Sequence, residues 1–194
     1  ADNMDSDPPV MKFVDCNDAT CSTSSITTPD SDLNGTSTVT NFGLSGSIYC
    51  PASIDCKILY LDEVGEATPL ITFADCNDTD CDAPALQTVD PDCGTTASKD
   101  CFMDLYCPAA DNCKYTYHDS AASDVFFGDC ADGPCTAATQ SEITIDSTVA
   151  LQGGKTALYC VTSSQCKVFY HDITDGDVSF VDCAAAGTPE TCAT

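Results

Sequence analysis

The sequence contains no arginine and only six lysines, against thirty-one acidic residues, which gives a net charge of −25. Nucleic-acid binding is driven by cationic side chains that neutralise phosphates, so nucleic acid is excluded as a partner. An acidic surface instead favours calcium ions or basic partners, and it keeps copies of a chain apart at low ionic strength.

The sequence also lacks long apolar runs and helical periodicity. No apolar stretch approaches the roughly 18 residues of a membrane span, and no signal peptide is visible, so a secreted chain would be present here in processed form. Apolar residues nevertheless make up 43% of the chain, with many Val, Ile, Phe and Tyr, which argues against disorder.

Cysteine, in contrast, is abundant, with sixteen residues. They fall into eight couples of sequence neighbours: Cys16 and Cys21, Cys50 and Cys56, Cys76 and Cys81, Cys93 and Cys101, Cys107 and Cys113, Cys130 and Cys135, Cys160 and Cys166, and Cys183 and Cys192. Because the members of a couple occur together, and a short turn can bring two Cα atoms within about 5.5–6 Å, we expect disulfides inside the couples, although spacing alone does not fix the connectivity. So many disulfides predict an extracellular or cell-surface location.

One sequence module recurs along the chain. It reads YHDITDGDVSFVDC at Tyr170–Cys183 and stands again at Tyr117–Cys130 and Tyr60–Cys76, while its second half appears alone at Met11–Cys16. The cysteines that end the four copies are 60, 54 and 53 residues apart. Units of about 40–60 residues with four short strands are typical of β-propeller blades. The sequence therefore predicts an all-β, four-bladed β-propeller-like fold, stapled by disulfides, with one blade incomplete.

The repeat divides a single domain, residues 1–194, into a connector and four blade-like units, at about 1–10, 11–46, 47–90, 104–146 and 157–192. The expected strands are, unit by unit, Met11–Cys16 and Ser22–Thr28; Ser47–Cys50, Cys56–Asp62, Leu70–Cys76 and Ala85–Asp90; Asp104–Cys107, Cys113–Asp119, Val125–Cys130 and Glu142–Asp146; and Ala157–Cys160, Cys166–Asp172 and Val178–Cys183.

Two features of these units bear on assembly. The first unit lacks two strands, which a neighbouring chain could supply, and the last unit is expected to end without a fourth strand, while a further strand signal lies in the link at Thr38–Phe42. Alternation along the strands places the recurrent aromatic residues on one face, where we expect them to pack between blades: Phe13, Phe73, Phe127 and Phe180.

The pattern Y-x-D-x-x-x-G-D-V-x-F-x-D-C-x(4)-C, followed by a strand containing T-x-D, resembles a repeat that is widespread in secreted bacterial and algal proteins. That repeat reads roughly P-V-I-S-Y-Y-D…G-D-L-K-V-A-H-C-N-D-x-x-C, and it is matched best at Tyr170–Cys183 and Phe73–Cys81, within residues 11–192. The chain differs in the first strand, where Y-C-x5-C-K replaces a segment rich in serine and leucine. The resemblance implies propeller-like blades, and it extends to glycosylated extracellular filaments built from small propellers.

Few residues carry candidate catalytic chemistry. His118 and His171 occupy the same repeat position, where the third copy has Leu61, so neither is expected to be a catalytic base. No G-x-S-x-G, P-loop or H-E-x-x-H motif is present, and zinc is disfavoured because there is no C-x2-C pair. We therefore expect no enzyme activity and no catalytic residue.

Two sets of charged residues recur with the repeat. Lys57, Lys114 and Lys167 each follow a cysteine and are expected to form ion pairs of little energetic weight if exposed. Each F-x-D-C copy carries an aspartate: Asp15, Asp75, Asp129 and Asp182. Their carboxylates are expected to cap N–H groups of the following turn, and a fourfold metal ring is the alternative.

The strongest metal and glycan signals compete at one place. Asp30, Asp32 and Asn34 match the start of a calcium loop, but its twelfth position holds Asn41 instead of glutamate, so calcium would bind weakly, and no other cofactor is expected. Asn34 also begins an N-glycosylation sequon, which we favour over the metal site, and Asn77 begins a second sequon.

These features predict a structural extracellular glycoprotein, a repeating subunit of a filament or surface coat. Its expected partners are copies of itself, joined by strand or edge pairing, and covalent glycans. The alternative is a secreted carbohydrate- or ligand-binding propeller, such as a lectin or an adhesin.

Overall fold

The computed structural model of the chain describes residues 13–16, 22, 24–28, 46–52, 55–62, 70–78, 80–91, 93, 101–137, 140–147, 155–172, 174–184 and 191–193. The regular structure in these ranges consists of strands, joined by turns, so the all-β prediction is confirmed. Within the same ranges, no helix has the length and apolar character that crossing a membrane would require.

Fourteen strands form four antiparallel sheets in this part of the chain. The sheets contain β1 (Phe13–Cys16) and β2 (Ser24–Thr27); β3 (Gly46–Ala52), β4 (Asp55–Asp62), β5 (Leu70–Cys76) and β6 (Ala85–Asp90); β7 (Met103–Ala109), β8 (Asn112–Asp119), β9 (Asp124–Cys130) and β10 (Gln140–Asp146); and β11 (Thr156–Thr162), β12 (Gln165–Asp172), β13 (Asp177–Ala184) and β14 (Thr191–Ala193). Strand order in every sheet follows the chain, so each repeat unit is an antiparallel meander.

The two end units differ in how well the sequence predicted them. The last unit does have a fourth strand, contrary to the prediction: β14 pairs with β13, with Cys192 opposite Cys183. This strand was missed because three residues are too short to show alternation. The first unit has the two expected strands, and among the described strands β1 pairs with β2 alone. The strand signal at Thr38–Phe42 lies outside the described residues.

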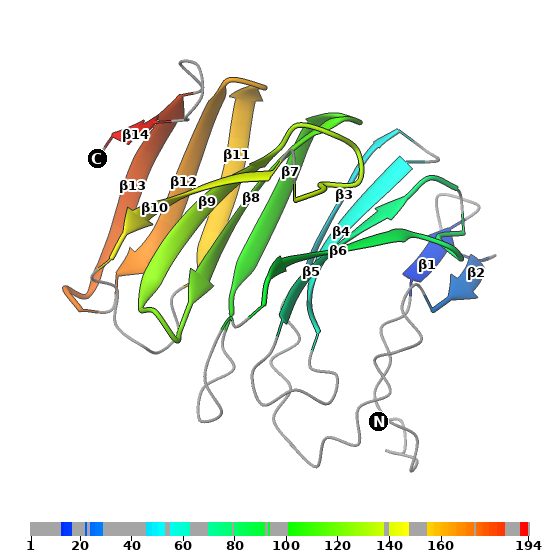
Figure 1. The fold of residues 1–194 in the computed structure, drawn as a ribbon, viewed down its shortest axis with the longest axis horizontal. Helices are drawn as coiled ribbons and strands as arrows, with labels where there is room; N and C mark the ends of the chain where they lie inside the picture. Colours follow the sequence, from blue (N-terminus) through cyan, green and yellow to red (C-terminus); the bar gives the residue numbers. More distant parts are fainter. Residues whose placement is uncertain are drawn as a thin grey trace, which may run out of the picture.

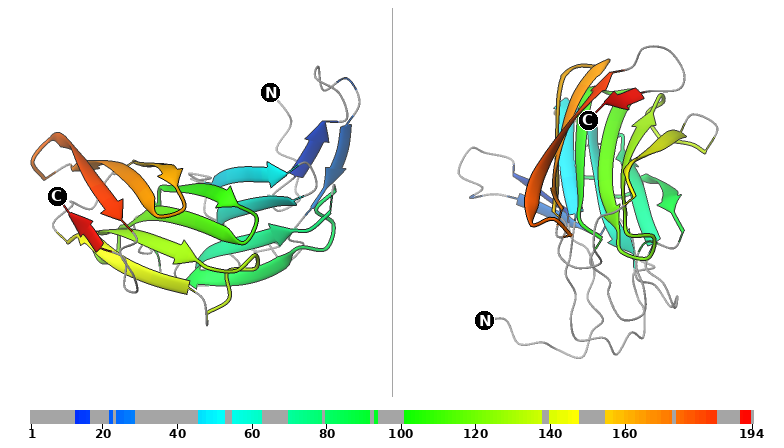
Figure 2. Two further views of the ribbon diagram at one scale, coloured as in Figure 1. Left: turned by 90° about the horizontal axis from the view of Figure 1, so that it is seen from above. Right: turned by 90° about the vertical axis from the view of Figure 1, so that its left-hand side faces the viewer.

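The sheets follow one another in a curved row (Figures 1 and 2), with β1–β2 at one end and β11–β14 at the other. They do not close into a ring, so the four-bladed propeller stays a prediction. The first strands of the three large sheets run side by side, because β7 contacts both β3 and β11. The row therefore has two ends, and each end presents a sheet face.

Successive sheets pack face to face through apolar side chains. We call the face of a sheet that packs on the following sheet its forward face, and the face that packs on the preceding sheet its rear face. In β7–β10, Val125 and Phe127 lie on the forward face and pack on the rear face of β11–β14. Leu105 and Tyr115 lie on the rear face of β7–β10 and pack on the forward face of β3–β6.

Two further contacts join the sheets along their first strands. Tyr49, Tyr106 and Tyr159 occupy equivalent positions and form a row, with ring centroids 4.7 Å and 5.5 Å apart. Asp104 on β7 bridges both neighbours, because Oδ1 accepts a hydrogen bond from Ser47 Oγ and Oδ2 accepts one from the Leu158 amide, each at 2.8 Å. The first strands thus hold the three sheets in a fixed order.

The recurrent Y-x-D module forms the turn between the second and third strands of a sheet. Asp119 Oδ1 accepts a hydrogen bond from the Ala121 amide, and Asp172 Oδ1 accepts one from the Thr174 amide. The turn needs a left-handed residue, which is Gly176 at φ 75° in the last sheet and Ser123 at φ 64° in the preceding one. Glycine adopts this conformation without steric cost. The glycine of the motif therefore suits the turn, and Ser123 adopts the same conformation at a steric cost.

Seven of the eight expected cysteine couples are joined as disulfides. They are Cys50–Cys56, Cys76–Cys81, Cys93–Cys101, Cys107–Cys113, Cys130–Cys135, Cys160–Cys166 and Cys183–Cys192. Such a density of disulfides is typical of an oxidising, extracellular environment.

The eighth expected disulfide, between Cys16 and Cys21, is not among those that the structure describes. Cys16 ends β1, but Cys21 lies outside the described residues. The disulfide between Cys16 and Cys21 therefore stays a prediction from the sequence.

Candidate functional site

The recurrent lysines and aspartates form cross-strand ion pairs on the forward faces. Lys57 Nζ pairs with Asp75, its register partner on β5, and also lies 2.5 Å from Asp55. Lys114 pairs with Asp129, while both lysine side chains are 2% exposed. The predicted ion pairs are therefore confirmed, but these two lysines are buried, so the low energetic weight expected for exposed pairs does not apply to them.

Lys57 shows how completely such a pair is covered. A Cβ added to Gly133, in a turn of the following sheet, would lie 3.3 Å from Asp75 Oδ2 and 3.8 Å from Lys57 Nζ. Burial by itself lowers the pKa of Lys57. Hydrogen bonds and negative charge from Asp55 and Asp75 together outweigh this effect, so the pKa of Lys57 lies above its ordinary value. The ammonium group therefore stays charged inside the sheet stack.

The turn-capping role predicted for these aspartates belongs to other residues. Asp75, Asp129 and Asp182 each pair with a lysine of their own sheet, so they do not gather into a metal ring. The cap comes from the second residue after the cysteine: Asp78 Oδ1 accepts a hydrogen bond from the Cys81 amide, and Asp132 Oδ1 accepts one from the Thr136 amide. Asp15, on β1, is half-buried.

The two histidines have opposite surroundings although they share a repeat position. His118 is fully buried on the forward face of β7–β10, whereas His171 is exposed on the forward face of β11–β14. The difference arises because a further sheet covers the first and no described sheet covers the second.

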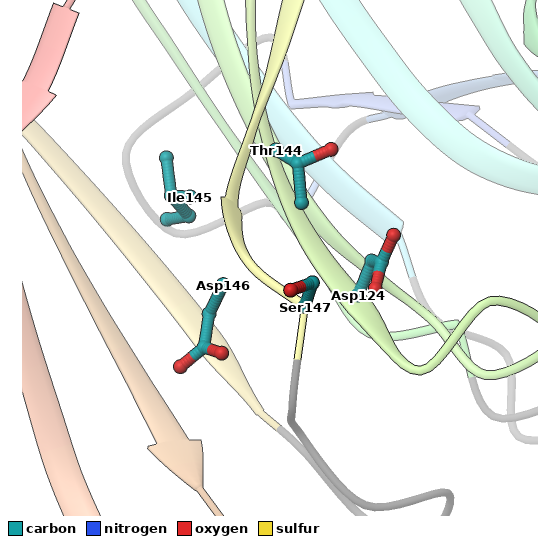
Figure 3. A pocket seen from close by; sticks show the side chains of 5 residues that line it. All are labelled: Asp124, Thr144, Ile145, Asp146 and Ser147. Carbon is teal, nitrogen blue, oxygen red and sulfur yellow. The ribbon is translucent and has the colours of Figure 1, made fainter.

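A hollow of about 500 Å³ lies beside the start of β9 and the end of β10. Figure 3 shows its lining, with Thr144 and Ile145 on opposite sides of β10 and the carboxylates of Asp124 and Asp146 nearby. Burial, followed by the charges of Asp119 and Asp146, raises the pKa of Asp124. Within the described ranges, no three His, Cys, Asp or Glu residues are placed to hold a metal ion.

Glu142, on the outer strand β10, is an acid whose pKa is shifted strongly upward. The residue as a whole is exposed, but desolvation of its carboxyl group by the surrounding side chains raises its pKa to about 7. The charges of Asp90 and Asp119 act in the same direction, while a hydrogen bond with Tyr117 opposes them. In the unfolded chain a glutamate ionises near pH 4.3. The folded state therefore holds one proton more than the unfolded state between these two pH values.

We expect the stability of the fold to fall as the pH rises from about 4.3 to 7, because the unfolded state binds fewer protons in this window. Glu142→Gln should flatten this decline and raise the melting temperature at pH 8 relative to wild type. The measurement is thermal unfolding from pH 4 to 9, with Asp82→Asn, on an exposed turn, as the control for loss of one charge. An unchanged pH profile in Glu142→Gln would contradict the assignment.

The forward face of the last sheet differs in exposure from the forward faces of the two preceding sheets. Its residues have equivalents in the two preceding sheets: Ile71 and Val125 are 0% exposed, but Val178 is 71% exposed. Phe73 and Phe127 are 0% and 1% exposed, but Phe180 is 43% exposed. The expectation that this recurrent phenylalanine packs between blades is therefore wrong for its last copy within the described structure.

Other side chains extend this apolar surface. Phe169 contacts Phe180, with ring centroids 4.8 Å apart, and Tyr159 and Val161 are exposed on β11. Lys167 pairs with Asp182 and lies over the Phe180 ring, 4.9 Å from its centroid. Surfaces of this kind mark interaction sites on soluble proteins. We call the surface formed by Tyr159, Val161, Phe169, Val178 and Phe180 the open forward face.

The opposite end of the row carries exposed apolar residues on rear faces. Val14 and Ile26 are register partners on β1 and β2, and both side chains are exposed. Ile48 on β3 is exposed too, whereas its equivalents Leu105 and Leu158 are buried. We call the surface formed by Val14 and Ile26, on the rear face of β1–β2, the open rear face; Ile48 lies on the rear face of the next sheet, β3–β6.

Of the candidate glycan and calcium positions, only Asn77 lies among the described residues. Asn77 is exposed directly after β5, and its side-chain amide donates to Asp75 Oδ2 at 3.3 Å. Asp30, Asp32 and Asn34 lie outside the described residues, as Cys21 does, so the calcium loop and the first sequon stay predictions.

Comparison of the chain with protein-family models, with curated proteins and with solved structures found no match in any of the three. The two open faces are therefore the features of the molecule that bear most directly on its function.

Proposed function

We propose that this protein is a secreted structural glycoprotein whose copies assemble into a filament or a surface coat. The observation that supports this most is the contrast between Val178 and its equivalent Val125, because one position is largely exposed at the end of the row and fully buried inside it. A face that is built for burial, yet open, favours a partner that covers it.

Three other features are in keeping with an assembled extracellular material. The disulfides suit an oxidising environment, where a structural protein must persist. The resemblance of the repeat to that of propeller-built filaments points the same way. Asn77 in its exposed turn could carry a glycan without disturbing a sheet face.

The assembly function is tested by the size of the native or oxidatively folded protein. Light scattering after size exclusion, together with electron microscopy, is expected to reveal oligomers that lengthen as protein concentration rises. Reduction and deglycosylation followed by mass spectrometry would report the disulfides, the state of Cys21 among them, and any glycan on Asn77. Compact monomers of 20.3 kDa at every concentration would overturn the proposal.

A lectin or adhesin is the second candidate, since exposed aromatic rings beside charged side chains are also what carbohydrate sites use. Here Phe169 and Phe180 are tilted by 56° to one another, and Lys167 and Asp182 lie at their side. Specific binding on a glycan array that is lost in Phe180→Ala would favour this function over assembly.

A further inference from the structure

We infer that the open forward face of one copy docks on the open rear face of a second copy, so that the chains join head to tail and continue the row of sheets. This inference rests on the proposed assembly function and names the partner and the two surfaces that meet. The contact would repeat between molecules the packing that already holds the sheets together within one molecule.

The sheet-to-sheet contacts inside the chain supply the template. Two contacts join large sheets, and in both the forward face of one sheet packs on the rear face of the next. A third contact follows the same rule, because Phe13 on β1 packs on the rear face of β3–β6. Since the same surface types meet three times in the same sense, the rear face of a second copy is the natural cover for the open forward face.

The receiving surface has the matching property. Val14 is exposed, but its equivalents Ala74 and Val181 are 0% and 1% exposed. Ile48 is uncovered in the same way, because only the short sheet β1–β2 precedes β3–β6 among the described strands. Both ends of the row thus present positions whose equivalents elsewhere in the row are buried.

The two surfaces are different, so the contact is heterologous. After one copy has docked on another, the pair still has a forward face at one end and a rear face at the other. A heterologous contact of this kind gives an open filament, or a ring if the rotation closes. The curvature of the row (Figure 2) would set the turn between copies.

Size and charge define how strong the contact can be. Strands β11 to β13 have seven or eight residues, so at about 3.3 Å per residue and about 4.8 Å between strands they present a face of about 400 Å². This is small beside the roughly 800 Å² per partner of a standard interface. Each copy also carries a net charge of −25, so we expect added salt to promote assembly by screening repulsion.

The test uses one variant for each surface and then mixes them. Val178→Asp places a carboxylate in the forward face, and Val14→Asp places one in the rear face. Each variant alone is expected to require at least a tenfold higher concentration to assemble, because docking would bury an unpaired charge. The mixture is expected to form dimers and nothing longer, since one intact forward face meets one intact rear face.

A control variant and a folding check accompany the series. Ala122→Asp adds the same charge to an exposed turn of the middle sheet and should assemble like wild type. Near-ultraviolet circular dichroism and the mass of the unreduced protein show that each variant has the native packing and disulfides.

Each alternative outcome separates the inference from the function on which it rests. If wild type assembles and Val178→Asp assembles equally well, the inference fails and the assembly function stands. If Val178→Asp is monomeric but Val14→Asp assembles normally, forward faces meet one another, and the head-to-tail arrangement is overturned. If wild type remains a compact monomer at every salt concentration, the docking inference and the assembly function both fail. This result is expected if the two ends of the row meet within one chain.

Discussion

Replacing Lys57 by methionine is expected to lower the free energy of unfolding by about 3–5 kcal/mol, because the buried carboxylate of Asp75 loses its cation. The chain contains its own control at the equivalent position of the last sheet. Lys167→Met should cost less than about 1 kcal/mol, because Lys167 and Asp182 are 41% and 61% exposed and water can replace the partner. Urea or guanidinium unfolding of the oxidised monomer measures both changes.

A double replacement separates the charge effect from packing. Lys57→Met combined with Asp75→Leu should recover most of the loss, since an apolar pair can replace a buried ion pair at little cost. Asp55 remains beside position 57 but is less buried, so it can keep contact with water. Equal losses in Lys57→Met and Lys167→Met would show that the following sheet does not enclose the Lys57 pair.

Replacing Gly128 by valine is expected to destabilise the fold by about 3 kcal/mol, at the upper end of the effect of overpacking. A Cβ at this position would lie 2.0 Å from the ring carbon Cζ of Tyr115, which is the register partner of Gly128 on β8. The tyrosine is fully buried against the preceding sheet, so its ring cannot move into solvent to relieve the contact. The measurement is again the free energy of unfolding.

The repeat supplies the compensating change. At the same cross-strand position the last sheet has Val168 opposite Val181, and β3–β6 has Ile58 opposite Ala74. Gly128→Val combined with Tyr115→Val copies the pair of the last sheet and should be more stable than Gly128→Val alone. Absence of any recovery would show that the ring–backbone contact is not the source of the loss.

Much of the fold within a sheet was predictable from the sequence. The alternation around the F-x-D-C copies located β5, β9 and β13, and the cysteine spacing identified seven pairs that the structure joins. These signals are local, because strand alternation and a short disulfide loop depend on residues close together in the chain. The same spacing argument is all that supports the pairing of Cys21, which lies outside the described residues.

Relations between sheets were not predictable, because identical motifs have different neighbours. Lys57 and Lys167 stand in the same motif, yet one is enclosed and the other is exposed. Phe127 and Phe180 differ for the same reason. Repetition in the sequence indicates the repeat unit, but it does not show where the row of sheets ends.

The described disulfides also determine how the molecule would respond to a pulling force. Each joins cysteines five to nine residues apart, and the sheets themselves are joined by side-chain packing and by hydrogen bonds such as those of Asp104. Tension along the row would therefore separate the sheets one after another, while each disulfide keeps its own short loop from extending. An assembly of the kind we propose would yield in steps and keep the hairpins from which it can re-form.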